Sequence, residues 1–286
     1  DPYTTLPFVI RRRDAGAGTL ESRYLSLYEG YRNEPLVKEV RTLQLAGERV
    51  EGAEGTVAVA VTAGAHTDYL LHGVHASSVS ADTEHGELLF QGRAGVASLQ
   101  SSGLDILGVI GGGRISIGGY ALQLLSDESA LQGAIADSST DGFRIEGVHP
   151  ALAALEGHQI FVSDGKKQTA YPVRQVVFAD GKTRIVTQDT RGGFPFAGAE
   201  SWQAMQTGYA ERQDDGTWHM FATAPVRLTL PLSEINGERV SLAEYKSELS
   251  EDDEWRLLEC LIDQDRVQIT LPAEVVAQGA LRLRFH

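Results

Sequence analysis

The sequence has little cysteine and no long apolar run. Cys260 is its single cysteine, so no disulfide can form within the chain. No run of apolar residues approaches the ~18 to 20 that a membrane-spanning helix needs, and we therefore expect no membrane partner. The chain opens on Asp1-Pro2 without a methionine or a signal peptide. That opening leads us to expect a processed product or a piece of a longer protein.

The sequence also lacks the short motifs of nucleophilic and phosphate chemistry. No Gly-x-Ser-x-Gly elbow is present, and Cys260 lies in an apolar pattern, where burial raises the pKa of a thiol and makes it inert. Residues Gly108–Arg114 resemble a phosphate loop but lack its Gly-Lys-Ser/Thr ending, so we predict a hairpin turn there. Asp137, Asp141 and Glu146 do not have the spacing of a calcium loop. We expect no cofactor and no bound metal.

Positive charge is scarce. Lys and Arg number 25 against 39 Asp and Glu, which gives a formal net charge of -14. Such a field repels polyanions, so we expect no nucleic-acid partner. A local exception is the triplet Arg11-Arg12-Arg13. On a strand Arg11 and Arg13 share a face, and guanidinium groups pair well with carboxylate or sulfate. These two arginines are the candidate substrate-binding residues for an acidic polysaccharide, and a solvated charged surface is the alternative.

Strand-like alternation is what the sequence has in abundance. It recurs from Thr56–Val61 to Val267–Leu271, and helical periodicity is nearly absent. Asp-Gly and Asn-Gly dipeptides, which favour the positive φ angles of tight turns, separate the segments at Asp164, Asp180, Asp215 and Asn236. We predict an all-β protein: an antiparallel β-sandwich followed by a smaller β unit, with very little helix.

The loop-like stretch Asp137–Gly142 suggests two parts. We predict a β-sandwich portion at residues 1–125 and one or more C-terminal β-rich units at residues 126–286. Beyond residue 200 we predict strands at Trp218–Ala222, Val226–Leu230, Trp255–Ile262, Val267–Leu271 and Leu281–Phe285. The acidic run before Trp255 leaves a helix open as the alternative to the third of these strands.

The densest run of titratable side chains lies at His66–His75. On a strand His66, Asp68, Leu70 and His72 point to one face. Two imidazoles and a carboxylate could bind zinc or serve acid–base chemistry. Residues two apart on a strand lie about 6.5 to 7 Å apart, however, and Leu70 interrupts the row. The alternative interpretation is a strand end with exposed polar groups.

Five aromatic residues are candidates for sugar-stacking platforms or for the fillers of a β-sandwich core. Core packing is the more ordinary role for such side chains, and nothing in their spacing marks them as exposed. They are Tyr120, Tyr171, Trp202, Trp218 and Trp255.

Several stretches resemble, in order, the region that follows the catalytic part of heparinase II/III-like polysaccharide lyases. The resemblance covers roughly Thr4 to Asp189, and nothing after Thr190 contributes to it. Gly30 departs from the family pattern, which more often has proline there. The matching pieces are Tyr24–Val37, Ala58–Val61 with His66–Leu71 (containing Thr67-Asp68-Tyr69), Leu89–Val96, Gln159–Gly165, Ala170–Val173 and Thr183–Ile185.

The resemblance implies a C-terminal, non-catalytic β domain of a bacterial lyase that cleaves uronate-containing glycans, such as glycosaminoglycan or alginate, by β-elimination. It implies a periplasmic or secreted protein whose partners are an acidic polysaccharide and the N-terminal catalytic domain of the same protein. The family's catalytic histidine motif would lie before Asp1, so no catalytic residue carries over to this chain. The alternatives are a stand-alone carbohydrate-binding or protein-interaction β module, and a small metalloenzyme that uses His66, Asp68 and His72.

Overall fold

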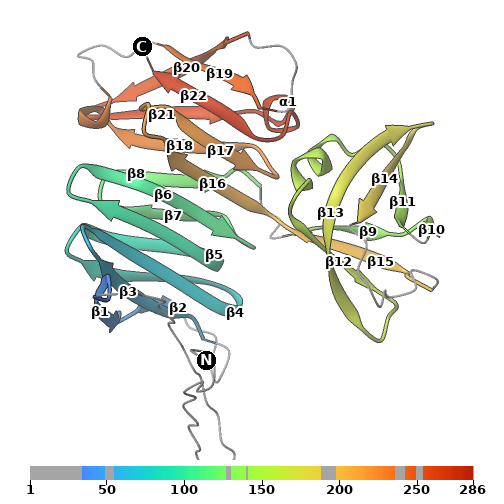
Figure 1. Cartoon of the computed structure of the whole chain (residues 1–286), viewed down its shortest axis with the longest axis horizontal. Helices are drawn as coiled ribbons and strands as arrows, with labels where there is room; N and C mark the ends of the chain where they lie inside the picture. Colours follow the sequence, from blue (N-terminus) through green and yellow to red (C-terminus); the bar gives the residue numbers. More distant parts are fainter. Residues whose placement is uncertain are drawn as a thin grey trace, which may run out of the picture.

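The structure is a computed structural model that describes residues 34–48, 55–126, 130–139, 141–187, 198–235, 242–248 and 254–285. Within these ranges helix is confined to two 3-10 segments, η1 (Pro150–Leu155) and η2 (Leu232–Glu234), and to the short helix α1 (Ala273–Val276). Antiparallel strands make up the rest of the regular structure (Figure 1). The predicted all-β fold with very little helix is confirmed. No helix in these ranges has the length and apolar character to cross a membrane.

The larger body is an antiparallel sheet that closes on itself. From β5 the hydrogen-bonded order runs through the later strands to β7, and β7 pairs back onto β5. Large apolar side chains from all round this ring, among them Phe90, Leu107 and Trp218, fill one core. In order the described strands are β1 (Val37–Thr42), β3 (Val57–Ala63), β4 (His66–Thr83), β5 (Gly86–Gln100), β6 (Gly103–Ile110), β16 (Thr207–Arg212), β17 (Trp218–Ala222), β22 (Leu281–Phe285), β19 (Leu242–Ser247), β20 (Arg256–Asp263), β21 (Arg266–Leu271), β18 (Val226–Pro231), β8 (Tyr120–Leu124) and β7 (Arg114–Ile117), with β2 (Ala46–Glu48) beside β4.

The glycine run Gly111-Gly112-Gly113 is not a hairpin turn, and that prediction is wrong. β6 pairs with the second half of β5, and β7 pairs with the first half of the same strand. The glycines therefore join two segments that run in the same direction along β5. A Cβ atom on Gly112 would lie 2.1 Å from the Cα of Gly92 on β5, so the two backbones touch. A glycine run permits either a turn or such a close approach, and the sequence does not distinguish them.

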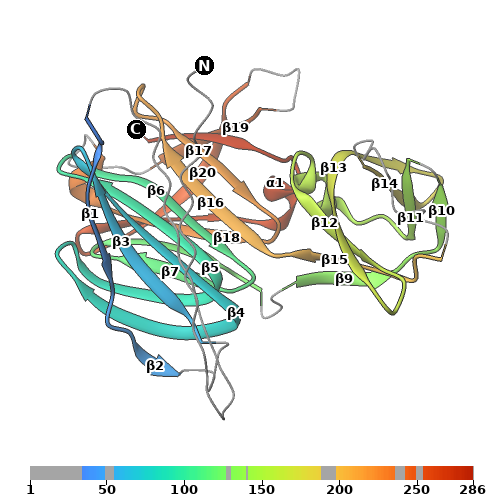
Figure 2. The same ribbon diagram turned by 60° about the horizontal axis from the view of Figure 1, so that its bottom comes forward.

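The smaller body is a second antiparallel sheet with its own core, which includes Phe143, Tyr171 and Trp202. The chain enters it after β8 and returns through Gln206 to β16 of the first sheet (Figure 2). The predicted domain boundary at residue 125 stays a prediction. Strand pairing shows in addition that the chain goes back to the first sheet after Gln206. The strands are, in order, β10 (Asp137–Ser139), β11 (Gly142–Glu146), β14 (Lys182–Thr187), β13 (Gln168–Ala179), β12 (Gln159–Ser163), β15 (Ser201–Met205) and β9 (Ala130–Ala134).

The Asp-Gly dipeptides that the structure describes do form turns. Asp180 and Gly181 have φ angles of 53° and 71° and join β13 to β14 as a two-residue turn. Gly165 and Gly216 also have positive φ angles and lie in longer connections. Asn236-Gly237 lies outside the described residues. Three of the dipeptides therefore have the role that their backbone preference predicts.

The stretch before the last hairpin is a strand. Residues Arg256–Asp263 form β20, which pairs with β19 on one side and with β21 on the other. The strand alternative is thus confirmed and the helix alternative is wrong. Gln264, with φ 56°, makes the turn into β21.

Candidate functional site

The candidate residues taken from the sequence do not meet in one site. Arg11 and Arg13 lie outside the described residues, so the basic patch stays a prediction. His66, Asp68 and His72 do share the outward face of β4, as predicted, but they engage different neighbours or none. The Nδ1 atom of His66 lies 2.9 Å from the carboxylate of Asp105, and Asp68 accepts a hydrogen bond of 2.6 Å from Ser98. Across the described ranges no cluster of three or more His, Cys, Asp or Glu has the arrangement to hold a metal.

The remaining candidates, Cys260 and the three acidic residues considered for calcium, are either partly buried or held in ion pairs. Burial raises the pKa of the Cys260 thiol, as the apolar pattern around it predicts. The three acidic residues considered for calcium each form an ion pair with a basic residue on a neighbouring strand. The pairs are Asp137 with Arg144, Asp141 with Arg184, and Glu146 with Lys182.

Four of the five candidate aromatic residues are core residues. Tyr120, Tyr171, Trp202 and Trp218 are each less than a tenth exposed, as core packing predicts. Trp255 is half-buried at the outer face of β19 and β22. There the guanidinium carbon of Arg284 lies 4.1 Å from the centre of a Trp255 ring. That ring is therefore already covered by a cation.

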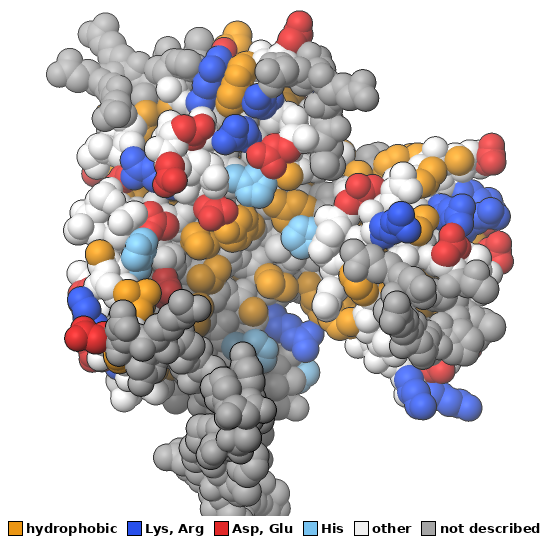
Figure 3. Space-filling model, in the orientation of Figure 1, with side chains coloured by type: hydrophobic (Ala, Val, Ile, Leu, Met, Phe, Trp, Pro, Cys, Tyr) orange, Lys and Arg blue, Asp and Glu red, His pale blue; other side chains and the backbone are white. Residues whose placement is uncertain are grey.

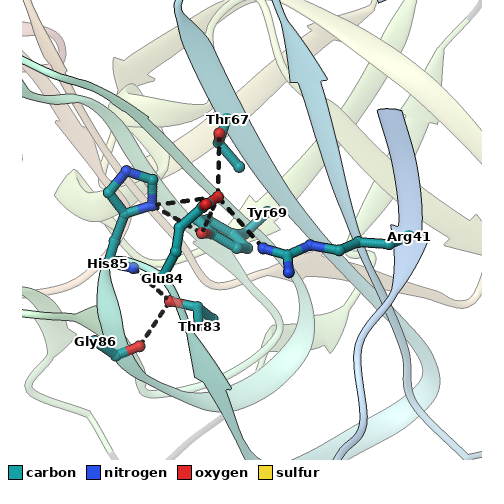
Figure 4. Close-up of polar contacts among 7 residues, drawn as sticks. All are labelled: Arg41, Thr67, Tyr69, Thr83, Glu84, His85 and Gly86. Carbon is teal, nitrogen blue, oxygen red and sulfur yellow. Dashed lines mark hydrogen bonds and ion pairs between the residues drawn. The ribbon is translucent and has the colours of Figure 1, made fainter. Parts of the chain in front are cut away.

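A Tyr–His–Glu network at the tip of the β4–β5 hairpin has the right groups for acid–base chemistry but not the access (Figure 4). The Tyr69 hydroxyl lies 2.8 Å from Nδ1 of His85, and the carboxylate of Glu84 lies 3.3 Å from the guanidinium of Arg41 on β1. The Tyr69 side chain is 0% exposed, and burial is the main cause that raises its pKa. A substrate therefore cannot reach this hydroxyl. The contacts of the network instead hold β1, β4 and the turn together.

The hollow between the two bodies is the candidate functional site, and we call it the junction groove. Figure 3 shows hydrophobic side chains gathered there, with histidines along its edges. The upper cavity of the groove has a volume of about 490 Å³, within the usual range for ligand sites. Its floor is the outward face of β5, β6, β16 and β17, and its far wall is η1 with His158. The lining includes Ala94, Val96, Gly108, Ile110, Tyr209 and Phe221.

Strand alternation explains why this floor faces outward. On β16 Gly208 and Ala210 turn to the core, so Tyr209 and Glu211 turn away from it. On β6 Gly108 points outward, and a Cβ atom there would lie 3.0 Å from Val96 Cγ1 and 3.4 Å from Tyr209 Cδ2. Val96 and Tyr209 therefore close tightly over Gly108, and the floor leaves no room for a side chain at this position.

His158 closes one side of this floor. Its ring stacks on Phe221, with 4.1 Å between the ring centres and 15° between the planes. The neighbouring wall residue, Glu156, is held in place because its carboxylate accepts a hydrogen bond of 2.7 Å from the Val176 backbone. The groove is thus walled by ordered side chains from both bodies.

A lower cavity of about 470 Å³ continues the groove past His158. It shares Ala94, Ile110 and Thr207 with the upper cavity and adds Arg93 and His72. Within the described part of the chain the side chains of Arg93 and His72 have no hydrogen bond and no ion pair. An unpaired guanidinium therefore stands at this end of the groove.

The opposite end of the groove is acidic. There Nε2 of His219 lies 3.2 Å from the carboxylate of Glu248, and Nδ1 lies 3.9 Å from that of Glu211. Burial and Glu211 raise the pKa of Tyr209 to about 12, so its hydroxyl stays protonated at neutral pH. The groove thus runs from a carboxylate-rich end, over an apolar floor, to Arg93.

Burial among apolar atoms lowers the pKa of His158 below its ordinary value. As pH falls through about 6.5, the unfolded chain takes up a proton at this residue, and the folded chain does so only at lower pH. The free energy of unfolding should therefore decrease on acidification through that window. We expect His158→Phe, which keeps the stack, to remove this part of the pH dependence in denaturant unfolding. An NMR titration in which His158 protonates at or above pH 6.5 would contradict the prediction.

The sequence did not single out the residues of the groove. Arg93, His158, Tyr209 and Phe221 lie on four separate segments, and no short motif contains two of the first three. The alternation at Tyr209 indicates an outward side chain on a strand, but not what lies opposite to it. Only the pairing of β16 with β6 brings these residues together.

Comparison with protein-family models, with curated proteins and with solved structures finds no match to this chain. The fold therefore defines the class, a closed antiparallel β-sandwich that carries a second, smaller β body. Any assignment of family or activity is a proposal.

Proposed function

We propose that this chain is a non-catalytic β domain of a heparinase II/III-like polysaccharide lyase and that it contacts a uronate-containing glycan. The observation that carries the glycan contact is the junction groove, which combines an apolar floor, aromatic walls and the guanidinium of Arg93, which has no acidic partner among the described residues. Ligand sites commonly have this composition, an apolar concavity with a few polar groups that orient the ligand.

The arrangement of the family-like segments supports the proposal. The pieces between Ala58 and Val96 lie on β3, β4 and β5, which are neighbours in the first sheet in that order. The later pieces lie on β12, β13 and β14, which are neighbours in the second sheet. Segments that resemble the family in sequence order therefore also form two contiguous patches of structure.

We assign binding to this groove and catalysis to another domain of the same protein. β-Elimination at a uronate needs a base for the proton beside the carboxylate and an acid for the leaving oxygen. Tyr209 has a pKa of about 12, raised by burial and by Glu211, and so it is a poor base at neutral pH. The catalytic work is proposed for the N-terminal domain that the family resemblance implies. A stand-alone glycan-binding module would use the same groove without that domain.

We expect the isolated 286-residue chain to migrate more slowly in a gel loaded with a uronate glycan than in a gel without glycan. We also expect it to release no unsaturated uronate. The physical reason is that the groove supplies contacts, while the proposal assigns the proton transfers to the N-terminal domain. The measurement is affinity electrophoresis beside an ultraviolet assay on heparin, chondroitin, hyaluronan and alginate. Product formation by the chain alone would show that it is catalytic. A chain that no glycan retards would contradict the proposed contact.

The lyase assignment has a separate test in the gene. A helical catalytic segment of several hundred residues encoded upstream of Asp1 would support it. A different enzyme there, or no further coding sequence, would favour the stand-alone module.

A further inference from the structure

We infer that the junction groove is a subsite for one ring of an unsulfated uronate oligosaccharide, with the apolar face of the pyranose on Gly108 and the carboxylate on Arg93. This inference rests on the proposed function, because it names the ligand class and the orientation for the same groove. It goes further in assigning a specificity against densely sulfated glycans.

The floor of the groove fits a flat, apolar ring face. At Gly108 the side chains of Val96 and Tyr209 close over the backbone, since a Cβ atom there would lie 3.0 Å from Val96 Cγ1 and 3.4 Å from Tyr209 Cδ2. Ala94 beside it contributes only a methyl group. One face of a pyranose ring presents C–H groups, which pack on such a floor and against aromatic walls. Tyr209 and the stacked pair of Phe221 and His158 supply those walls.

The two ends of the groove fix the direction of an anionic ligand. Arg93 is half-buried and, within the described residues, has no acidic partner. Its guanidinium can therefore form a paired hydrogen bond with a carboxylate without breaking an ion pair of the protein. Glu211 and Glu248 beside His219 repel an anion at the other end. A uronate should thus point its carboxylate toward Arg93 and its uncharged hydroxyls toward His219.

The charge balance of the groove selects the class of glycan. A uronate ring without sulfate brings one negative charge, and Arg93 is the one arginine or lysine among the described residues that lines either cavity. A sulfated disaccharide brings several negative charges to the same space. Its extra charges would face Glu156, Glu211 and the net charge of -14 without a matching cation. Unsulfated uronans, such as alginate or hyaluronan fragments, are therefore the expected ligands.

Calorimetric titration with an unsulfated oligouronate, its carboxyl-reduced analogue and a heparin fragment of equal length tests the inference. We expect Arg93→Gln to weaken oligouronate binding roughly ten-fold or more, the usual effect of losing a charge-assisted hydrogen bond. Gly108→Val, whose side chain would displace Val96 or Tyr209 from the floor of the groove, should abolish binding. Arg174→Gln is the matched control, because Arg174 is exposed on β13, has no partner for its side chain among the described residues and lines neither cavity. It should bind as the unaltered chain does.

The carboxyl-reduced ligand gives a readout that does not depend on the folding of a variant. It should bind the unaltered chain as weakly as the oligouronate binds Arg93→Gln, and Arg93→Gln should weaken it no further. Oligouronate binding that neither variant changes would overturn the inference and leave the proposed glycan contact standing at another surface. Tighter binding of the heparin fragment would overturn the ligand class. A chain that binds none of the ligands would overturn the proposed contact itself.

Discussion

Replacing Gly112 with alanine is expected to lower the free energy of unfolding by about 3 kcal/mol or more, at the upper end of overpacking effects. A Cβ atom at this position would lie 2.1 Å from the Cα of Gly92 and 2.4 Å from the carbonyl oxygen of Gln91. Both are backbone atoms of β5, which cannot rotate away as a side chain can. Relief requires β5 to separate from the segment that joins β6 to β7, where the ring of strands closes.

Denaturant unfolding of Gly112→Ala beside Gly113→Ala measures this effect with a matched control. A Cβ atom on Gly113 would meet only the side chain of Gln91, at 3.5 Å, and its φ is not in the left-handed region. We expect that control to lie within about 1 kcal/mol of the unaltered chain. Equal destabilisation by both substitutions would contradict the close approach of the two backbones.

The second large effect on the free energy of unfolding is expected from substitutions at Phe90. Its ring is 2% exposed and occupies the space above Gly95, where a Cβ atom would lie 2.6 Å from Phe90 Cε2. Phe90→Ala should lower the free energy of unfolding by roughly 3 to 5 kcal/mol, because it leaves a cavity in the core of the larger body. Gly95→Ala should cost roughly 1 to 3 kcal/mol, because the ring must move.

A double-mutant cycle tests whether these two costs have the same origin. In a Phe90→Leu background the smaller side chain gives the new methyl group room, so Gly95→Ala should cost much less than in the unaltered chain. The coupling free energy from denaturant unfolding of the four proteins is the measurement. Additive effects of the two substitutions would show that Phe90 does not occupy the space above Gly95.

Local patterns were enough to predict the fold class. On β21 Val267, Ile269 and Leu271 are buried while Gln268 and Thr270 are more exposed, as the alternation of their sequence indicates. The two-residue turn at Asp180-Gly181 likewise follows from the backbone preferences of those residues. Both features depend on neighbours in the sequence, which is why sequence reasoning identifies them.

Pairing between distant strands was beyond such reasoning. Leu107 on β6 pairs with Ala210 on β16, and no local signal marks that pairing. The sequence pattern predicts no strand between residues 201 and 212, although β15 and β16 lie there and bring the chain back to the first sheet. The junction groove depends on this return. For that reason Arg93, His158 and Tyr209 could not be grouped from the sequence.

The prediction of a basic patch had a different limit. It used charge and alternation around Arg11 and Arg13, and both residues lie outside the described part of the chain. Charge counting also could not separate a paired arginine from an unpaired one. Arg184 has Asp141 as its partner at 2.7 Å, whereas Arg93 faces the groove. Only the positions of the neighbouring strands show which arginine is available to an anionic ligand.

The central claim is that the groove between the two bodies holds a uronate ring. A crystal structure of the chain with an unsulfated uronate tetrasaccharide tests it most directly. We predict electron density for one ring over Gly108, between Tyr209 and His158, with the carboxylate within hydrogen-bonding distance of the Arg93 guanidinium. A tetrasaccharide bound at another surface, with the groove unoccupied, would contradict the claim.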